Sequence, residues 1–285
     1  MSYIKRLDLA FEKASVLPVT NNTKYVFFSD CHRGVGNNND NFLKNENCYL
    51  AALHYYYQNG FYYIEVGDGD ELWENKSLNQ IMEIHEKIFS MLSCFQKSKR
   101  SYLLYGNHDM VKKGNEDILE GIIFHSQNPP LDLYVTHGHQ ADFLNSVLWK
   151  LARFLVRHLW APLEYFGVLD PTSAAKNNKK RNKIEKRLIN YAKNKDCLLL
   201  CGHTHRPTLG NAASPYFNCG SCVHPKGITC IELDGFHLKL VKWYASVDPC
   251  KHFDDIYNVN PAYPLYIKRE VLEETSLLPN NFICR

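Results

Sequence analysis

Five short segments of the chain carry residues that bind metal ions or transfer protons. The segments are "SDCHRG", "VGDGDELWE", "YGNHD", "THGH" and "CGHTHRP", and their candidates are Asp30, His32, Asp68, Asn107, His108, His137, His203 and His205. Carboxylate and amide oxygens mixed with imidazole nitrogens suit manganese, iron, zinc or cobalt ions, and this mixture does not choose among them. The set holds more ligands than one catalytic ion needs, so it predicts two ions.

Each segment also has a simpler interpretation when it is taken singly. A lone histidine after a strand is more often a hydrogen-bonded core or loop residue, and Gly-Asp or Gly-Asn pairs are common in turns. His203 and His205 of "CGHTHRP" fit polar turn residues, two ligands of one ion, or ligands of two ions. The choice depends on whether the five segments meet in space.

The elements around these segments follow a regular pattern. A short run of apolar, β-favouring residues precedes each polar cluster, and the clusters end at residues 30, 68, 109, 139 and 205. Such runs, bounded by turn residues, predict buried strands. Helical patterns over residues 42–57, 78–95 and 145–165 alternate with them, which predicts an α/β sheet with parallel strands. Ligands bind beyond the carboxyl ends of such strands, so we expect the polar clusters to share one edge.

The last third of the chain shows a different pattern. Asp-Gly lies between two runs of alternating polarity, residues 227–233 and 236–244. This arrangement is typical of a β-hairpin. We therefore expect the fold to end in antiparallel strands.

One segment, residues 143–196, departs from the alternation of strands and helices. Its first part, residues 143–167, is strongly apolar at near-helical spacing, and its second part, residues 176–195, is basic with Glu185 as its only acid. The second part follows "LDPTS", which has the features of a helix start. The segment fits a packed helix with a solvated charged face, or a cap that meets an anionic or amphipathic substrate or an anionic membrane surface. We expect one domain, residues 1–285, with residues 143–196 as a helical cap inserted in it.

Composition narrows the class of protein. The chain has 285 residues and a net charge of +3, and a nucleic-acid-binding domain would usually be more basic. The first residues lack the apolar run of a signal peptide, and no stretch of about 20 apolar residues predicts a membrane span. The ten cysteines therefore predict thiols rather than disulfides, and we expect a cytoplasmic protein, with peripheral membrane contact through 143–196 as an option.

Taken in order, the five segments resemble the signature of the calcineurin-like metallophosphoesterases, D-x-H, GD, GNHD, H and GHxH, over residues 30 to 205. The resemblance implies an α/β fold, a sandwich of two mixed β-sheets flanked by helices. It implies two metal ions, identified only as manganese, iron or zinc. The implied ligands are Asp30, His32 and His205 for the first ion, Asn107, His137 and His203 for the second, and Asp68 as the bridge between them.

The same resemblance implies a reaction. A hydroxide bridging the two ions would attack a phosphomonoester or phosphodiester. His108 would face the scissile phosphate and protonate the leaving group, with Asp109 orienting or polarising it. Arg33 and Arg206 stand next to ligand positions and are candidates for substrate binding. Asp70, Glu71 and Trp73 would either orient the ligands or form a polar helix start.

Other substrates and functions stay open. "GHTHRP" together with a helical insertion after "HGH" is also similar to UDP-diacylglucosamine hydrolases, which cut the pyrophosphate of a lipid-linked nucleotide. Those hydrolases typically carry arginine where this chain has His108. A nuclease that holds nucleic acid on the basic segment and a non-catalytic scaffold are the remaining hypotheses. The partner is thus a phosphorylated small molecule or a lipid-linked substrate, with nucleic acid less favoured.

Overall fold

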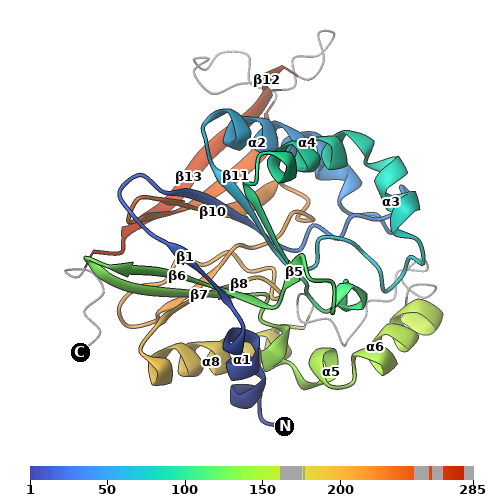
Figure 1. Ribbon diagram of the computed structural model, residues 1–285. Helices are drawn as coiled ribbons and strands as arrows, with labels where there is room; N and C mark the ends of the chain where they lie inside the picture. The colour runs from blue at the N-terminus through green and yellow to red at the C-terminus, as the bar shows by residue number, and fades with distance from the viewer. Residues whose placement is uncertain (161–174, 176, 247–256, 259–265, 279–285) are drawn as a thin grey trace.

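Two β-sheets pack face to face at the centre of the molecule (Figure 1). The computed structural model describes residues 1–160, 175, 177–246, 257–258 and 266–278. The five-stranded sheet contains, in spatial order, β1 (Ser15–Pro18), β6 (Gly121–Gln127), β7 (Pro130–Thr136), β8 (Leu198–Cys201) and β9 (Tyr216–Asn218). The eight-stranded sheet contains β12 (Tyr257–Asn258), β13 (Tyr266–Ser276), β11 (His237–Ser246), β10 (Ile228–Asp234), β2 (Lys24–Phe28), β3 (Tyr62–Val66), β4 (Ser101–Leu104) and β5 (Ile118–Leu119).

Both sheets are mixed. In the eight-stranded sheet β2, β3, β4 and β5 run parallel, whereas β10, β11 and β13 are antiparallel to their neighbours. In the five-stranded sheet β7, β8 and β9 run parallel, and β6 pairs with β7 in the antiparallel sense. The predicted hairpin is confirmed, since β10 and β11 pair directly around Asp234 and Gly235.

The main core lies between the two sheets. Phe27 and Ile64 from the eight-stranded sheet meet Phe124, Leu133 and Leu200 from the five-stranded sheet, and all five are fully buried. Burial of each such side chain contributes about 1.5–3 kcal/mol. The strands are apolar on both faces because a second apolar layer covers each outer face. The strand ends are therefore held by a dense core.

Helices complete four layers. On the eight-stranded sheet lie α2 (Glu46–Gln58) and α4 (Glu86–Lys97), and on the five-stranded sheet lie α1 (Tyr3–Glu12) and α8 (Asn178–Lys195). The shorter helices here are η1 (Leu43–Asn45), α3 (Leu78–Ile84), η2 (Met110–Lys112) and η3 (His139–Ala141). The predicted architecture, an α/β sandwich of two mixed sheets flanked by helices, is confirmed.

The segment predicted as a cap divides into two parts. Its beginning forms α5 (Phe143–Ser146), α6 (Trp149–Leu155) and the π-helical η4 (Val156–Trp160), which pack against Trp73 near the strand ends. The basic helix α8 instead packs on the five-stranded sheet through buried residues such as Leu188. The expected helix start at "LDPTS" lies outside the described residues. Of the helices that the structure describes, none combines the length and the apolar character that a membrane crossing requires.

Candidate metal centre

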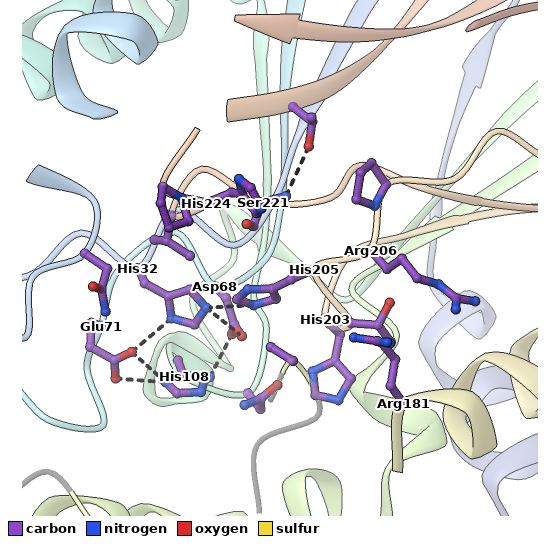
Figure 2. Close-up of a pocket in the computed structure, with 18 of the residues that line it drawn as sticks. His32, Asp68, Glu71, His108, Arg181, His203, His205, Arg206, Ser221 and His224 are labelled. Atoms are coloured by element: carbon purple, nitrogen blue, oxygen red, sulfur yellow. Dashed lines mark hydrogen bonds and ion pairs between the residues drawn. The ribbon is translucent and has the colours of Figure 1, made fainter. Parts of the chain in front are cut away.

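The five polar segments meet at one place. Backbone hydrogen bonds tie the loop after β2 to the loop after β3, from Asp30 N to Gly67 O at 3.1 Å, and the loop after β8 to that after β7, from Gly202 N to His137 O at 3.0 Å. A side chain joins the two sheets, because Asp30 Oδ2 accepts a hydrogen bond from His203 N at 2.9 Å. Figure 2 shows the side chains of His32, Asp68, His203 and His205 gathered there. The expected convergence of the strand ends is thus present.

Asp30, His32 and His205 form one group that could hold a metal ion. His205 Nε2 lies 3.0 Å from Asp30 Oδ1, and His32 Nε2 lies 3.3 Å from His205 Nε2. The other oxygen of Asp30 is occupied by hydrogen bonds from Ser29 Oγ, at 2.6 Å, and from His203 N. One carboxylate oxygen is therefore fixed by the protein, and the other faces the two imidazoles.

Asp68, His137 and His203 form a second group. His137 Nε2 lies 3.1 Å from Asp68 Oδ2. His137 Nδ1 lies 2.8 Å from the carbonyl oxygen of Val66, which can only accept, so Nδ1 carries a proton and Nε2 is the ring nitrogen that faces Asp68. Asp68 also lies within reach of the first group, 3.9 Å from His32 Nε2. The geometry lets Asp68 face both groups.

The two groups contain buried acceptors that have no donor. Among the described residues, Asp30 Oδ1, Asn107 Oδ1, His137 Nε2 and His203 Nε2 are buried without a hydrogen-bond partner. Buried polar atoms are nearly always paired, because an unpaired one costs about 1–3 kcal/mol. Cations bound at the two groups would supply partners for these atoms. These residues therefore fit a metal site.

The electrostatics of the two aspartates also fit a cation. Burial opposes ionisation of Asp30, but His205 and His137 outweigh it and hold its pKa well below the ordinary value. For Asp68, burial is likewise outweighed by His137 and His108, and its pKa is also lowered. Both carboxylates are thus ionised at neutral pH and available as metal ligands.

The backbone is strained where these side chains are presented. Positive φ angles, which non-glycine residues rarely adopt, occur at Asp30 (53°), His32 (47°), Asp68 (53°), His203 (65°) and His205 (55°). Each such residue costs on the order of 1–3 kcal/mol, and strain of this kind concentrates at functional sites. The left-handed conformation lets each loop turn sharply at the strand end and aim its side chain inward.

Two glycines permit the close packing of these loops. A Cβ atom at Gly106 would overlap Asp68 Oδ1, and one at Gly202 would overlap Ser29 Oγ. Each glycine therefore lets one loop approach a carboxylate that another loop presents. This explains a glycine directly before Asn107 and directly before His203.

His108 is held by a residue other than the expected one. Its Nδ1 contacts both carboxylate oxygens of Glu71, at 2.8 and 2.7 Å. The carboxylate of Asp109, to which the sequence analysis gave this role, accepts hydrogen bonds from Gly106 N and from the ammonium of Lys112. The orienting partner of His108 in the structure is therefore Glu71, and Asp109 fixes the loop instead.

The two arginines predicted to bind substrate differ in their surroundings. Arg33 is buried, and its guanidinium pairs with Asp70 at 2.7 Å and Glu65 at 2.8 Å, away from the cavity. Arg206 is half-exposed at the cavity and forms an ion pair with the buried Glu185 of α8. The structure thus corrects the expectation that Arg33 binds substrate. Its guanidinium instead holds Asp70 and Glu65 in place.

Sequence reasoning missed one carboxylate. Asp142 Oδ2 lies 3.5 Å from His203 Nε2 and 2.7 Å from Lys180 Nζ of α8. Burial works against ionisation of Asp142, but His203 and Lys180 lower its pKa to about 2. Its only sequence signal was its position three residues after His139, which itself lies buried beside His137 with a ring separation of 5.5 Å.

A cavity of about 860 Å³ opens over both groups. His32, Asp68, Asn107, His108, His203 and His205 line its floor. The other walls come from η4, through Val156 and Trp160, from Arg181 of α8, and from the segment of Ser221 to Gly227. This volume is within the range of small-molecule sites. The candidate metal ligands are therefore accessible to a substrate larger than a phosphate ion.

Comparison with known proteins adds little to this geometry. No family model and no curated protein matches the chain. Among solved structures, a cold-active protein tyrosine phosphatase aligns with 13% sequence identity and a TM-score of 0.43, over 82% of this chain and 79% of that chain. A mutant of a cold-active protein tyrosine phosphatase aligns with 13% identity and a TM-score of 0.42, over 82% and 81% of the two chains.

Proposed function

We propose that this protein is a metal-dependent phosphoesterase that uses two ions. The observation that carries the proposal is a set of four buried atoms that have no hydrogen-bond partner. They belong to Asp30, Asn107, His137 and His203 and lie beneath a cavity of about 860 Å³. Two groups of ligands share this place, and Asp68 faces both. Carboxylate, amide and imidazole ligands of this kind suit manganese, iron or zinc ions.

The chain's own residues have separate tasks in this proposal. Bound ions supply, at such a site, positive charge for a phosphoryl group and the acidity that makes water a nucleophile at neutral pH. The carboxylates of Asp30 and Asp68 neutralise only two of the positive charges that two divalent ions would bring. The remaining net positive charge attracts an anionic ester. His108 has Nδ1 bound to Glu71, which leaves Nε2 free to donate a proton to the leaving oxygen.

The substrate of this proposal is a phosphomonoester or phosphodiester, and one observation supports an alternative. Val156, Trp160 and Leu272 add apolar area to a cavity whose floor is polar. Such a cavity suits an amphipathic ester, such as the pyrophosphate of a lipid-linked nucleotide. His108 departs from the arginine typical of hydrolases for that substrate, so the simple esters remain our first choice.

A panel of substrates tests the proposal. Protein loaded with Mn²⁺ or Zn²⁺ is assayed against phosphomonoesters, phosphodiesters, nucleotide pyrophosphates with and without acyl chains, and single-stranded RNA and DNA. We expect hydrolysis of at least one ester class, lost on chelation and restored by metal. The His108→Ala variant should bind the same amount of metal and turn over more slowly. Full activity in metal-free protein, or no hydrolysis of any class, would overturn the proposal.

A further inference from the structure

Glu71 connects two functional histidines. One oxygen of its carboxylate lies 2.9 Å from His32 Nδ1, and both oxygens lie within 2.8 Å of His108 Nδ1 (Figure 2). The carboxylate also accepts hydrogen bonds from the backbone N–H groups of Trp73, at 3.2 Å, and of Glu74, at 3.3 Å. The position of Glu71 is therefore set by the loop that follows it, residues 72–75.

The same loop holds the ring of His108. The indole of Trp73 stacks on the imidazole with ring centroids 4.4 Å apart and planes 23° apart. The ring of His32 meets the imidazole edge-on, with centroids 4.6 Å apart. Because Trp73 is almost fully buried, its indole is a fixed surface. Glu71 and Trp73 together fix both the direction and the plane of the His108 ring.

A residue of the cap holds this loop in turn. Arg157, in η4, donates hydrogen bonds from its guanidinium to three backbone carbonyls: Trp73 at 2.8 Å, Asn75 at 3.0 Å and Leu72 at 3.1 Å. The cap also packs Ala152 and Val156 against Trp73. A planar guanidinium can bridge several carbonyls at once, which an ammonium does less well. The loop behind His108 is thus fastened to the cap.

We propose that Arg157 and Glu71 are positioning residues that make proton donation by His108 depend on the docked cap. The inference rests on the proposed function, in which His108 Nε2–H donates its proton to the leaving oxygen as the P–O bond breaks. Nδ1–H stays on Glu71 throughout, so the ring keeps one orientation. When Arg157 releases the loop, Glu71 and Trp73 shift and Nε2 no longer aims at the leaving oxygen. Binding of the ions, which the strand ends hold, does not require Arg157.

The experiment compares two ester substrates and two arginines. An alkyl phosphate needs protonation of its poor leaving group, whereas an aryl phosphate such as p-nitrophenyl phosphate needs little. Arg157→Ala should lower kcat for the alkyl ester about 10- to 100-fold and that for the aryl ester less than about 3-fold, since general acid catalysis contributes about 10²–10⁴-fold. Arg153→Ala is the matched control, because Arg153 lies in α6, one turn earlier, and in the described part of the chain its Nε has no hydrogen-bond partner. It should leave both rates unchanged.

A double-mutant cycle shows whether Arg157 acts through His108. In protein that already carries His108→Ala, the change Arg157→Ala should slow alkyl ester hydrolysis by no further factor. Metal content should equal that of the wild type in every variant. Equal losses on both esters, or a full additional loss in the His108→Ala background, would overturn the inference. If the wild type hydrolyses neither ester, the proposed function fails for these substrates, which is a different outcome.

Discussion

Two buried polar clusters lie next to each other at the strand ends and differ in how they are paired. The ion-pair cluster comprises Arg33, Asp70, Lys112 and Asp109, in which Lys112 Nζ lies 2.6 Å from Asp70 and 2.9 Å from Asp109. The acceptor cluster comprises Asp30, Asp68, Asn107, His137 and His203, and one buried atom in each of these residues except Asp68 has no hydrogen-bond partner. Neighbours in sequence belong to different clusters, since Asp68 and Asp70 lie two residues apart, as do Asn107 and Asp109.

The difference in pairing suggests that the ion-pair cluster stabilises the fold and that the acceptor cluster binds ions. Removing one partner of a buried ion pair strongly destabilises the folded protein, because the remaining charge is left uncompensated. The acceptor cluster keeps four buried atoms without a hydrogen-bond partner, which costs free energy that bound cations would offset. The ion-pair cluster fixes the loops so that the acceptor cluster can exist. Substitutions in the acceptor cluster should therefore mainly affect activity, and substitutions in the ion-pair cluster should mainly affect stability.

The largest expected effect is on activity, at Asp68. Asp68→Asn keeps the shape of the side chain and removes the charge that faces both ligand groups. We expect kcat to fall about 1,000-fold, since metal ions contribute several kcal/mol of transition-state stabilisation. Stability in the presence of a chelator should fall less than in Asp70→Asn, because Asp68 faces histidines and not the side chains of Arg33 and Lys112. Steady-state kinetics, metal analysis and urea unfolding in EDTA measure these outcomes, and an active Asp68→Asn protein would contradict the comparison.

The next largest effect is on stability, at Asp70. Asp70→Asn removes the carboxylate that neutralises both Arg33 and Lys112. We expect the free energy of unfolding to fall by about 3 kcal/mol, because each of the two cations loses one charge-assisted hydrogen bond and keeps another, Arg33 with Glu65 and Lys112 with Asp109. Urea unfolding in EDTA gives the value, with Asp68→Asn as the matched control. The comparison is wrong if Asp70→Asn is as stable as the wild type and Asp68→Asn is the destabilised variant.

Addition of metal should stabilise the protein through the acceptor cluster alone. Mn²⁺ or Zn²⁺ at 100 times its Kd should raise the free energy of unfolding by about 2.7 kcal/mol, because an ion that binds only the folded state shifts the equilibrium. Asp68→Asn should lose most of this increase, and Asp70→Asn should keep it on its lower baseline. Thermal unfolding over a metal titration measures both. Equal stabilisation of the two variants would mean that the metal binds elsewhere.

The sequence predicts the acceptor cluster better than the ion-pair cluster, for a physical reason. The histidines of the site follow strand ends within four residues, and parallel strands bring their ends together. They are His32, His137, His203 and His205. Positions within a loop depend on its backbone turns, which the apolar pattern does not encode. For that reason the sequence points to Asp109 as the residue that orients His108. In the structure the left-handed turn at Asp68 brings Glu71 to the His108 ring instead.

The arrangement of the helices was also only partly predictable. The apolar spacing of residues 78–95 predicts one helix, but the chain forms α3 and α4 with a break at His85. His85 turns inward there to Asp40 and Glu46, a long-range contact that no local pattern encodes. The sequence leaves open whether the segment 143–196 is a packed helix with a charged face or a cap, and in the structure Leu188 and Tyr191 of α8 complete the core of the five-stranded sheet. Amphipathic spacing predicts a buried face and does not say which sheet buries it.

The last expected effect concerns pH and a third cluster, His85 with its two acids. His85 Nε2 lies 3.1 Å from Asp40 and Nδ1 lies 2.9 Å from Glu46, so this buried cluster is paired like the ion-pair cluster. Burial works to lower the pKa of His85, but Asp40 and Glu46 prevail and raise it from the usual 6.5 to about 9. The protonated ring therefore stabilises the fold fully below pH 6.5, and this stabilisation is lost as pH rises through about 9.

We expect the free energy of unfolding to fall by about 3 kcal/mol between pH 6.5 and pH 9.5 from His85 alone. Histidines of the acceptor cluster titrate as well, so the difference between wild type and His85→Gln isolates this contribution. The glutamine variant is less stable at pH 6.5, because it brings no charge to Asp40 and Glu46, and the gap should narrow toward pH 9.5. Urea unfolding in EDTA at five pH values measures the gap. A gap that stays constant with pH would mean that His85 is neutral in the fold, and that hydrogen bonds without charge hold this third cluster.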